Sequence, residues 1–224
     1  MIQDIHAHTY FSNCGRDEPE VVLQAAYEGG IQEFGFCDHN YGIGDRIVSY
    51  EKMMKDLAQK WSDRLILRCG IEIATVPGLF LADGYDISGF DFCLIEHIDH
   101  PESTLGMGIL DFPAKYGCKT GIAHTDLFGW CEKRGQKPEE FFRQLAEAGI
   151  FWEMNVSYDS IHNYREHAYV KNFMESEYQQ TVVREAGAAI SVGFDGHRVE
   201  DYRPDRVKAM GDFLDARQIP RLRF

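Results

Sequence analysis

The residues of this chain that could do chemistry are histidines and acids placed directly after short apolar runs. The chain has nine histidines, and the first two form His6-Ala7-His8 at the end of such a run. Side chains alternate along a strand, so His6 and His8 point to the same side. The other members of the set are His39, Glu72, His97, His124, Asp195 and His197. Imidazole and carboxylate groups bind zinc, iron and manganese, so these residue types predict a metal site.

That prediction depends on elements that bring distant residues together. Short apolar runs alternate with longer amphipathic segments, which is typical of strands followed by helices. The expected strands cover residues 1–5, 33–37, 65–73, 90–95, 120–123, 150–156 and 188–193. The expected helices cover residues 19–28, 46–62, 105–116, 138–148, 168–186 and 204–216, and a loop with a short helix covers residues 77–88. This alternation predicts an α/β fold with a parallel sheet, but seven strands suit a closed barrel about as well as an open doubly wound sheet.

The candidate ligands share one end of the expected strands. In parallel α/β folds the carboxyl ends of the strands meet at one edge, where active sites lie. Taken singly, each residue has an ordinary explanation: Asp195-Gly196-His197 suits a turn, and Glu72 could pair with an arginine. Chance does not place an acid or an imidazole at nearly every strand end, so the set as a whole favours a metal site.

Composition restricts the class of protein. The 224 residues are 44% hydrophobic, enough for one core, and we expect a single domain over residues 1–224. The net charge of −13 disfavours binding to a nucleic-acid backbone. The sequence shows no apolar run of membrane-spanning length and no secretory signal at its start, so we expect a cytoplasmic protein. The six cysteines form no CxxC pair, which argues against a zinc ribbon or a thioredoxin-type motif.

The ordered set of histidines and acids resembles the PHP (polymerase and histidinol phosphatase) family. The opening Asp-Ile-His-Ala-His-Thr, the pair Asp38-His39 and the closing Asp195-Gly196-His197 carry the resemblance, which spans residues 4–197. It implies a single-domain, distorted barrel of seven βα units with a metal cluster at the carboxyl ends of the strands. It also implies a phosphoesterase that uses two to three zinc, iron or manganese ions.

The resemblance further implies how the ligands divide among three ions. The first ion would be held by His6, His8, Glu72 and Asp195. The second would share Glu72 as a bridging ligand and bind His97 and His124. The third would bind Cys14, His39 and His197.

Two of these ligand positions carry alternatives. Cys14 departs from the family pattern, which has His or Asp there. A thiolate is a good ligand for zinc or iron, so we expect Cys14 to bind, with Asp17 as the substitute if Cys14 turns away. His97 and His100 lie close together in the sequence. His97 directly follows the apolar run and is the expected ligand, whereas His100 is expected to contact substrate or to support a ligand.

The reaction that the resemblance implies is hydrolysis of a small phosphomonoester, such as histidinol phosphate. A metal ion lowers the pKa of bound water from 15.7 to about 7, so the expected nucleophile is a metal-activated hydroxide. Glu72 and Asp195 are catalytic candidates because they would hold the ions. The candidate proton donors are a metal-bound water, Asp38, Asp126 and His100.

Substrate contacts are expected from two arginines and three loops. Arg16 and Arg198 lie beside ligand positions, and a guanidinium binds phosphate oxygens in pairs. Substrate choice is assigned to residues 75–86, 126–136 and 157–166. The last segment could present Tyr158, His162 and Arg165 to the same edge of the sheet, whereas His167 is expected to be solvated.

Three other functions stay open at the level of the sequence. Hydrolysis of a C–N bond at a similar edge sometimes uses a carboxylated lysine, and no lysine follows an expected strand. A 3′–5′ exonuclease is disfavoured by the charge of −13. A non-catalytic metal-binding module is disfavoured by the nearly complete ligand set. The sequence does not determine the oligomeric state.

Overall fold

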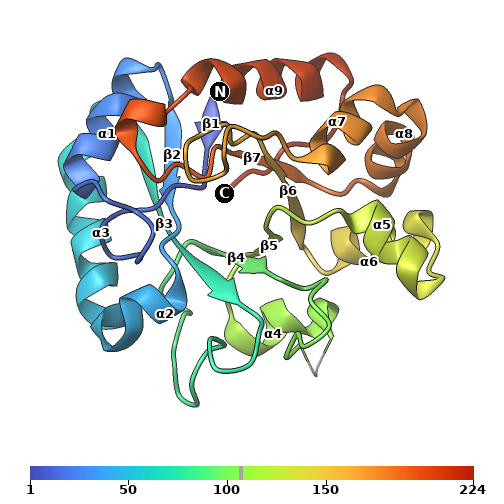
Figure 1. Cartoon of the computed structure of the whole chain (residues 1–224), viewed down its shortest axis with the longest axis horizontal. Helices are drawn as coiled ribbons and strands as arrows, with labels where there is room; N and C mark the ends of the chain where they lie inside the picture. The colour runs from blue at the N-terminus through green and yellow to red at the C-terminus, as the bar shows by residue number, and fades with distance from the viewer. Residues whose placement is uncertain (106–107) are drawn as a thin grey trace.

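The computed structural model describes residues 1–105 and 108–224, and at its centre lies a sheet of seven parallel strands (Figure 1). The strands are β1 (Gln3–Asp4), β2 (Glu33–Phe36), β3 (Ile66–Ala74), β4 (Phe92–Glu96), β5 (Thr120–Ile122), β6 (Phe151–Asn155) and β7 (Ile190–Gly193). Each strand pairs in parallel with the next one along the chain. All seven expected strands are confirmed. Their short runs are apolar because strands of a parallel sheet are buried on both faces.

The sheet nearly closes on itself between its first and last strands. The Ile5 N–H donates to the Val192 carbonyl at 3.1 Å, and the His8 N–H donates to the Gly196 carbonyl at 2.8 Å. Ala7 and Gly196 form a further parallel bridge. Of the two arrangements that the sequence allows, the chain therefore adopts the barrel, with a very short first strand.

Two phenylalanine rings in the interior of the barrel lie over glycines. A Cβ atom at Gly35 or Gly70 would collide with the buried ring of Phe92. A Cβ atom at Gly121 would collide with the buried ring of Phe151. Glycine therefore lets the strands enclose large rings at the density of a protein interior.

Side chains alternate along each strand between this interior and the surrounding helices. On β4, Phe92 and Leu94 belong to the inner apolar cluster, whereas Cys93 and Ile95 belong to the outer one. The same period of two continues to Glu96, which places its carboxylate on the interior side. The carboxyl end of the barrel is thus lined by the inward residues of the strands.

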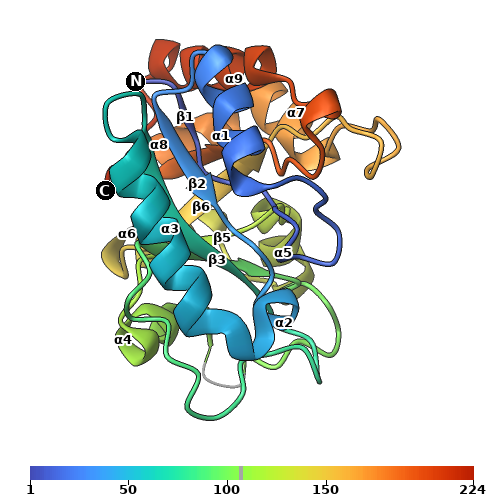
Figure 2. The same cartoon turned by 90° about the vertical axis from the view of Figure 1, so that its left-hand side faces the viewer.

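Helices form a ring outside the barrel (Figures 1 and 2). They are α1 (Pro19–Glu28), α2 (Asn40–Ile43), α3 (Ile47–Trp61), α4 (Phe112–Tyr116), α5 (Leu127–Arg134), α6 (Pro138–Glu147), α7 (Ala168–Glu175), α8 (Glu177–Ala186) and α9 (Pro204–Ala216). Figure 2 shows α3 running along the outside of the sheet beside β2 and β3. Its buried residues Tyr50, Met54, Leu57 and Trp61 recur every three or four positions, which makes one apolar face. Among residues 1–105 and 108–224, no helix combines the length and the apolar character needed to cross a membrane.

Two segments differ from the sequence prediction because of helix capping. Residues 168–186 form two helices, since Ser176 has an extended backbone and its hydroxyl accepts from the Gln179 N–H at the start of α8. Residues 126–136, predicted as a loop, contain α5. There the Asp126 carboxylate accepts from the Gly129 N–H and caps the helix.

Two further segments are less helical than predicted. The predicted helix over residues 105–116 is a short 3₁₀ turn (Ile109–Asp111) followed by α4, and Gly106 and Met107 lie outside the described residues. Residues 77–88 form turns without a helix. Both segments are rich in glycine and proline, which favour turns.

Replacing Gly121 by alanine is expected to destabilise the barrel, because the added methyl group meets the ring of Phe151. Overpacking of a core costs about 1–3 kcal/mol, so the urea midpoint of unfolding should fall at unchanged slope. Combining Gly121→Ala with Phe151→Leu should recover part of the loss, because the smaller side chain frees the space. Equal stability of wild type and Gly121→Ala would contradict this packing.

Candidate metal centre

Side chains from the first, third and seventh strands converge at the carboxyl end of the barrel. His6 and His8 follow β1, Glu72 lies in β3, and Asp195 follows β7. His6 Nε2 lies 3.2 Å from His8 Nε2 and 3.3 Å from Glu72 Oε2. Asp195 Oδ1 lies 3.0 Å from His8 Nε2 and 3.5 Å from His6 Nε2. All four side chains are buried, so these nitrogen and oxygen atoms share one small volume.

Glu153 determines which nitrogen of His6 faces this volume. This β6 residue is fully buried, and its Oε1 lies 2.7 Å from His6 Nδ1. Its other oxygen, Oε2, accepts from the His124 backbone N–H at 2.9 Å. An ionised carboxylate only accepts, so His6 Nδ1 carries a proton and Nε2 is the nitrogen that faces the other ligand atoms.

Ser12 orients His8 in the same way. The Ser12 hydroxyl donates its single proton to Asp38 Oδ1 at 2.6 Å, so it can only accept from His8 Nδ1, which lies at 3.1 Å. The hydroxyl also accepts from the His39 backbone N–H at 3.0 Å. His8 Nδ1 therefore carries a proton, and Nε2 is the nitrogen that faces His6 and Asp195.

Two imidazole Nε2 atoms and two carboxylate oxygens thus face one another over 3.0–3.5 Å. Such electron-rich atoms repel one another in a buried site unless a cation lies among them. Among the described residues, His39 Nδ1, Glu72 Oε2 and Glu96 Oε1 are also buried without a hydrogen-bond partner. Imidazole nitrogens and carboxylate oxygens are zinc ligands, so the donor set fits divalent metal ions.

In the metal-free protein, protons take the place of the cation. Burial disfavours a charged ring, but nearby carboxylates, Glu153 foremost, outweigh burial and raise the pKa of His6 well above its usual range. The same balance between burial and carboxylates raises the pKa of His124 to about 9 and that of His197 to about 10. The cluster therefore attracts positive charge, whether as protons or as metal ions.

A second group of ligand atoms lies where β3, β4 and β5 end. His124 Nε2 lies 3.0 Å from Glu72 Oε1 and 4.0 Å from Glu96 Oε2. His39 Nδ1 lies 3.0 Å from Glu72 Oε2 and 3.2 Å from Glu96 Oε1. Glu72 thus presents Oε2 to His6 and His39 and Oε1 to His124, which joins the two groups.

The inward residue at the end of β4 is Glu96, not His97, which the sequence favoured. The Glu96 side chain is 5% exposed and the His97 side chain is 46% exposed, with His97 Nε2 lying 3.0 Å from Glu96 Oε2. Glu96 continues the inward positions of Phe92 and Leu94, whereas the backbone turns at His97 into the left-handed region with φ of 63°. The period of two along the strand would have selected Glu96.

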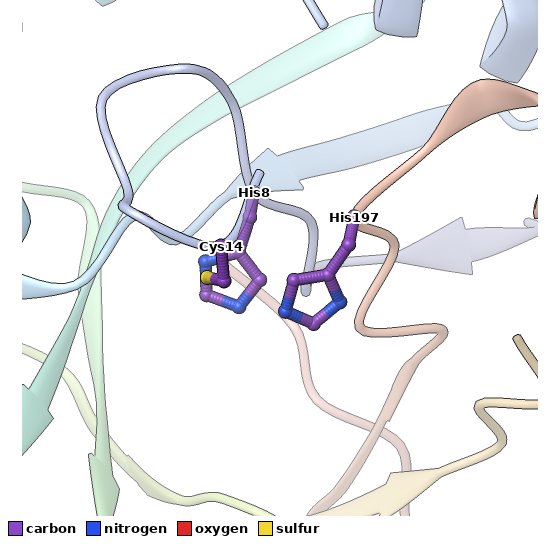
Figure 3. Close-up of side chains that lie close together, drawn as sticks. All are labelled: His8, Cys14 and His197. Atoms are coloured by element: carbon purple, nitrogen blue, oxygen red, sulfur yellow. The ribbon is translucent and has the colours of Figure 1, made fainter. Parts of the chain in front are cut away.

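Cys14 lies beside two histidines in a further group of ligand atoms (Figure 3). The ligand atoms of His8, Cys14 and His197 lie within 4.8 Å of one another. His197 Nδ1 donates to the Asp195 carbonyl oxygen at 2.8 Å, so Nε2 is the nitrogen available to a ligand group. Burial raises the pKa of the Cys14 thiol, but hydrogen bonds with His197 and His39 outweigh it and hold this pKa at about 6. A thiolate at neutral pH suits the ligand role expected of Cys14.

The loop after β6 adds an acid and a histidine to the same edge. His162 Nδ1 lies 2.7 Å from Asp159 Oδ1, and His162 Nε2 lies 3.5 Å from Asp195 Oδ2. Asp159 is buried, and its Oδ2 lies 3.6 Å from His197 Nδ1. The structure therefore places His162 at the edge that the sequence allowed for it.

Sequence reasoning missed Glu153 and Asp159. Glu153 had a detectable signal, because it is a lone acid within the apolar run Phe151-Trp152-Glu153-Met154. Asp159 had none, because it lies in a polar segment where an acid is ordinary. His167, expected at a solvated helix start, does lie at the start of α7, but its ring stacks on His124 with ring centroids 6.1 Å apart.

Two candidate proton donors have structural partners instead. The Asp38 carboxylate accepts from the N–H and the hydroxyl of both Thr9 and Ser12, so it orders the loop before Cys14 and is not placed to deliver a proton. Asp126 caps α5.

The remaining candidates lie around the margin. His100 is exposed, and its Nδ1 accepts from the Glu102 N–H at 3.1 Å. Arg16 is exposed and next to Gly15 in the loop that carries Cys14. Arg198 is half-buried and donates to the Ser160 hydroxyl at 3.1 Å. The two arginines therefore stay near the ligand groups without contacting the convergent atoms.

Solved structures share this fold at low sequence identity. A histidinol phosphate phosphatase from Lactococcus lactis subsp. lactis Il1403, in complex with zinc, L-histidinol and phosphate, has a TM-score of 0.62 at 13% identity over 98% of this chain and 95% of that one. A putative histidinol phosphatase from Listeria monocytogenes has a TM-score of 0.57 at 14% identity over 89% of this chain and 96% of that one. No protein-family model and no curated protein sequence matches the chain. At these identities the likeness establishes the barrel fold.

Metal uptake at pH 7 is expected to release protons, because His124 and His197 have raised pKa values and are protonated in the metal-free protein. Apparent zinc affinity should therefore rise with pH up to about 9–10 as these rings lose their protons. Titration calorimetry in buffers of different ionisation enthalpy measures the proton count. Zinc binding without proton release would contradict the assignment of these rings as ligands.

Replacing Glu96 by glutamine is expected to lower the metal content, whereas His97→Gln should lower it far less. Glu96 is the buried inward carboxylate and His97 is half-exposed beside it. Loss of a metal-supporting side chain commonly reduces affinity by about 10–100-fold. Elemental analysis of the two variants after dialysis against a weak chelator compares them directly. A larger loss of metal in His97→Gln than in Glu96→Gln would make His97 the ligand from this strand.

Proposed function

We propose that this chain is a metal-dependent hydrolase of small phosphate monoesters and a member of the PHP family. The observation that carries the proposal is the convergence of the His6 and His8 lone pairs with the carboxylates of Glu72 and Asp195. The barrel shared with the Lactococcus phosphatase, which binds zinc, L-histidinol and phosphate, supports the reaction class.

We assign two to three zinc, iron or manganese ions to overlapping groups around Glu72. The first group is His6, His8, Glu72 and Asp195. The second group is Glu72, Glu96 and His124, with His97 at its margin. The third group is Cys14, His39 and His197. When bound, such ions would neutralise phosphate charge and lower the pKa of a coordinated water.

The supporting residues keep the ligand rings in one tautomer. Glu153 and Ser12 hold the protons of His6 and His8 on Nδ1, so both Nε2 atoms stay available. Asp38 fixes the Ser12 hydroxyl in turn. Orientation of this kind raises ligand basicity and prevents the rings from flipping.

His162 and the two arginines are proposed to act on the phosphate ester itself. Burial lowers the pKa of His162, but the hydrogen bond with Asp159 outweighs it and raises that pKa. His162 Nδ1 donates its proton in a hydrogen bond to Asp159. The ring can therefore hold a second proton at Nε2 and donate that proton to the leaving oxygen. Arg16 and Arg198 are proposed to bind nonbridging phosphate oxygens from the margin.

The protein purified without chelator is expected to contain metal and to hydrolyse phosphate monoesters. Glu72→Gln should lose metal and more than about a hundredfold in kcat/KM, because Glu72 contributes to both sides of the cluster. The matched control is Glu147→Gln at the exposed end of α6, which should stay within about twofold of wild type.

Two other results would each replace this proposal. Preference for short oligonucleotides over monoesters would assign a nuclease. Stoichiometric metal without hydrolysis of any ester in a broad panel would assign a metal-binding module.

A further inference from the structure

The ligand atoms around Cys14 differ in their chemistry from the other candidate groups. Those of His8, Cys14 and His197 lie within 4.8 Å of one another (Figure 3). Among residues 1–105 and 108–224, every other group of neighbouring ligand atoms includes at least one carboxylate, whereas this group has one thiol and two imidazoles. An ion beside Cys14 would therefore meet sulfur and nitrogen, while an ion in the other groups would also meet carboxylate oxygen.

Two imidazole rings present the same nitrogen to the Cys14 sulfur. His197 Nδ1 donates to the Asp195 carbonyl oxygen at 2.8 Å, and His39 Nδ1 lies 3.0 Å from Glu72 Oε2. Both rings also form hydrogen bonds with the Cys14 side chain. Because each Nδ1 faces an oxygen, Nε2 is the nitrogen that each ring has left for the sulfur. An imidazole nitrogen and a thiolate sulfur are both zinc ligands.

The loop that carries Cys14 is fixed on both sides of this residue. Before it, the Ser12 N–H donates to the Thr9 carbonyl oxygen at 3.1 Å. After it, the Arg16 N–H donates to the His197 carbonyl oxygen at 3.2 Å, which ties the loop directly to the segment that carries this histidine. The thiol is therefore placed beside the His197 ring before any ion binds, and binding needs little rearrangement of the loop.

Asp17, the oxygen ligand that could substitute for Cys14, has another role in the structure. Its Oδ2 accepts from the Val199 N–H at 2.9 Å, and its carbonyl oxygen accepts from the Tyr10 N–H at 3.2 Å. Asp17 therefore joins its loop to the segment after β7. The ligand atom that this loop offers to the cluster is the sulfur of Cys14.

The type of ligand determines which metals a site prefers. Thiolates favour zinc and iron, whereas manganese is better suited to carboxylate and water oxygens. We propose that the Cys14 group, formed by Cys14, His39 and His197, selects zinc or iron(II) over manganese through its thiolate. The groups that contain carboxylates would accept all three metals. The inference rests on the proposed function for the presence of the cluster and adds the metal class of one of its ions.

Cobalt(II) tests the contact between the thiolate and the ion, because a cobalt–thiolate bond adds a charge-transfer absorption in the near ultraviolet. Chelator-treated wild type titrated with cobalt(II) should develop this absorption. Cys14→Ser should lose it and keep the weaker visible absorption of cobalt in the other groups. The matched control is Cys131→Ala, which removes a thiol buried in α5 and should keep the charge-transfer absorption. Absence of the absorption in wild type, or its persistence in Cys14→Ser, overturns the proposal.

A change of ligand type tests the selectivity. Imidazole and carboxylate sites also prefer zinc to manganese, so the informative quantity is the change in preference between variants. Cys14→Asp should lower the preference of the weakest site for zinc over manganese by at least about tenfold, because an oxygen replaces the sulfur. Competition of the two metals for chelator-treated protein, followed by the electron paramagnetic resonance of free manganese, measures this preference.

The matched control for this substitution is Asp17→Asn in the same loop, which should keep the preference of wild type. The amide oxygen of asparagine can still accept from the Val199 N–H. An unchanged preference in Cys14→Asp overturns the proposed role of the sulfur. A reduced preference in Asp17→Asn would instead assign the third ligand to Asp17.

Neither measurement depends on hydrolysis, so the two proposals can fail separately. If the cobalt–thiolate absorption forms and no ester is hydrolysed, the phosphoesterase proposal fails and the selectivity of the Cys14 group stands. If esters are hydrolysed and the absorption does not form, the phosphoesterase proposal stands and the inference about Cys14 fails. Wild type that binds no metal overturns both.

Discussion

The site depends on one constraint: two imidazole rings must keep their lone pairs on the same side of a buried volume. Glu153 holds the proton of His6 on Nδ1, and the Ser12 hydroxyl, committed to Asp38, holds that of His8 on Nδ1. Neither ring can turn without breaking a buried hydrogen bond, which costs about 1–3 kcal/mol when a partner is left unpaired. The surrounding carboxylates then leave a concentration of negative charge that only a cation relieves.

The barrel provides the space for this constraint. A Cβ atom at Gly193 would collide with the Glu153 carboxylate and lie 2.6 Å from His6 Cβ. The glycine on β7 therefore allows the buried acid of β6 and the histidine after β1 to meet. Asn155 pairs with Gly193 in the sheet register, and its side chain bonds to Asp195. Closure of the sheet between β1 and β7 is thus part of the candidate metal centre as well as of the fold.

The strands, the shared edge and most of the ligand candidates could be predicted because they follow local rules. Apolar runs of strand length end in an imidazole or an acid, and parallel strands bring those ends together. The choice between His97 and Glu96 depends on which residues of β4 face inward. The apolar run does not reveal this, because its inward and outward residues are all apolar. Asp159 could not be predicted, because loop conformation places it and an acid is ordinary in a polar segment. The same holds for α5, whose start depends on one capping carboxylate.

The net charge of the whole chain and the local charge of the site affect short and long phosphate-bearing substrates differently. A net charge of −13 produces a field that repels phosphates, and salt screens that field beyond about 8 Å at physiological ionic strength. Bound metal ions reverse the potential only within the cluster. A monoester has to place one phosphate in that small region, whereas a polynucleotide also has to lay its other phosphates along the acidic surface. The composition of the chain and the geometry of its buried ligands therefore both support the substrate class of the proposed function, a small molecule with a single phosphate.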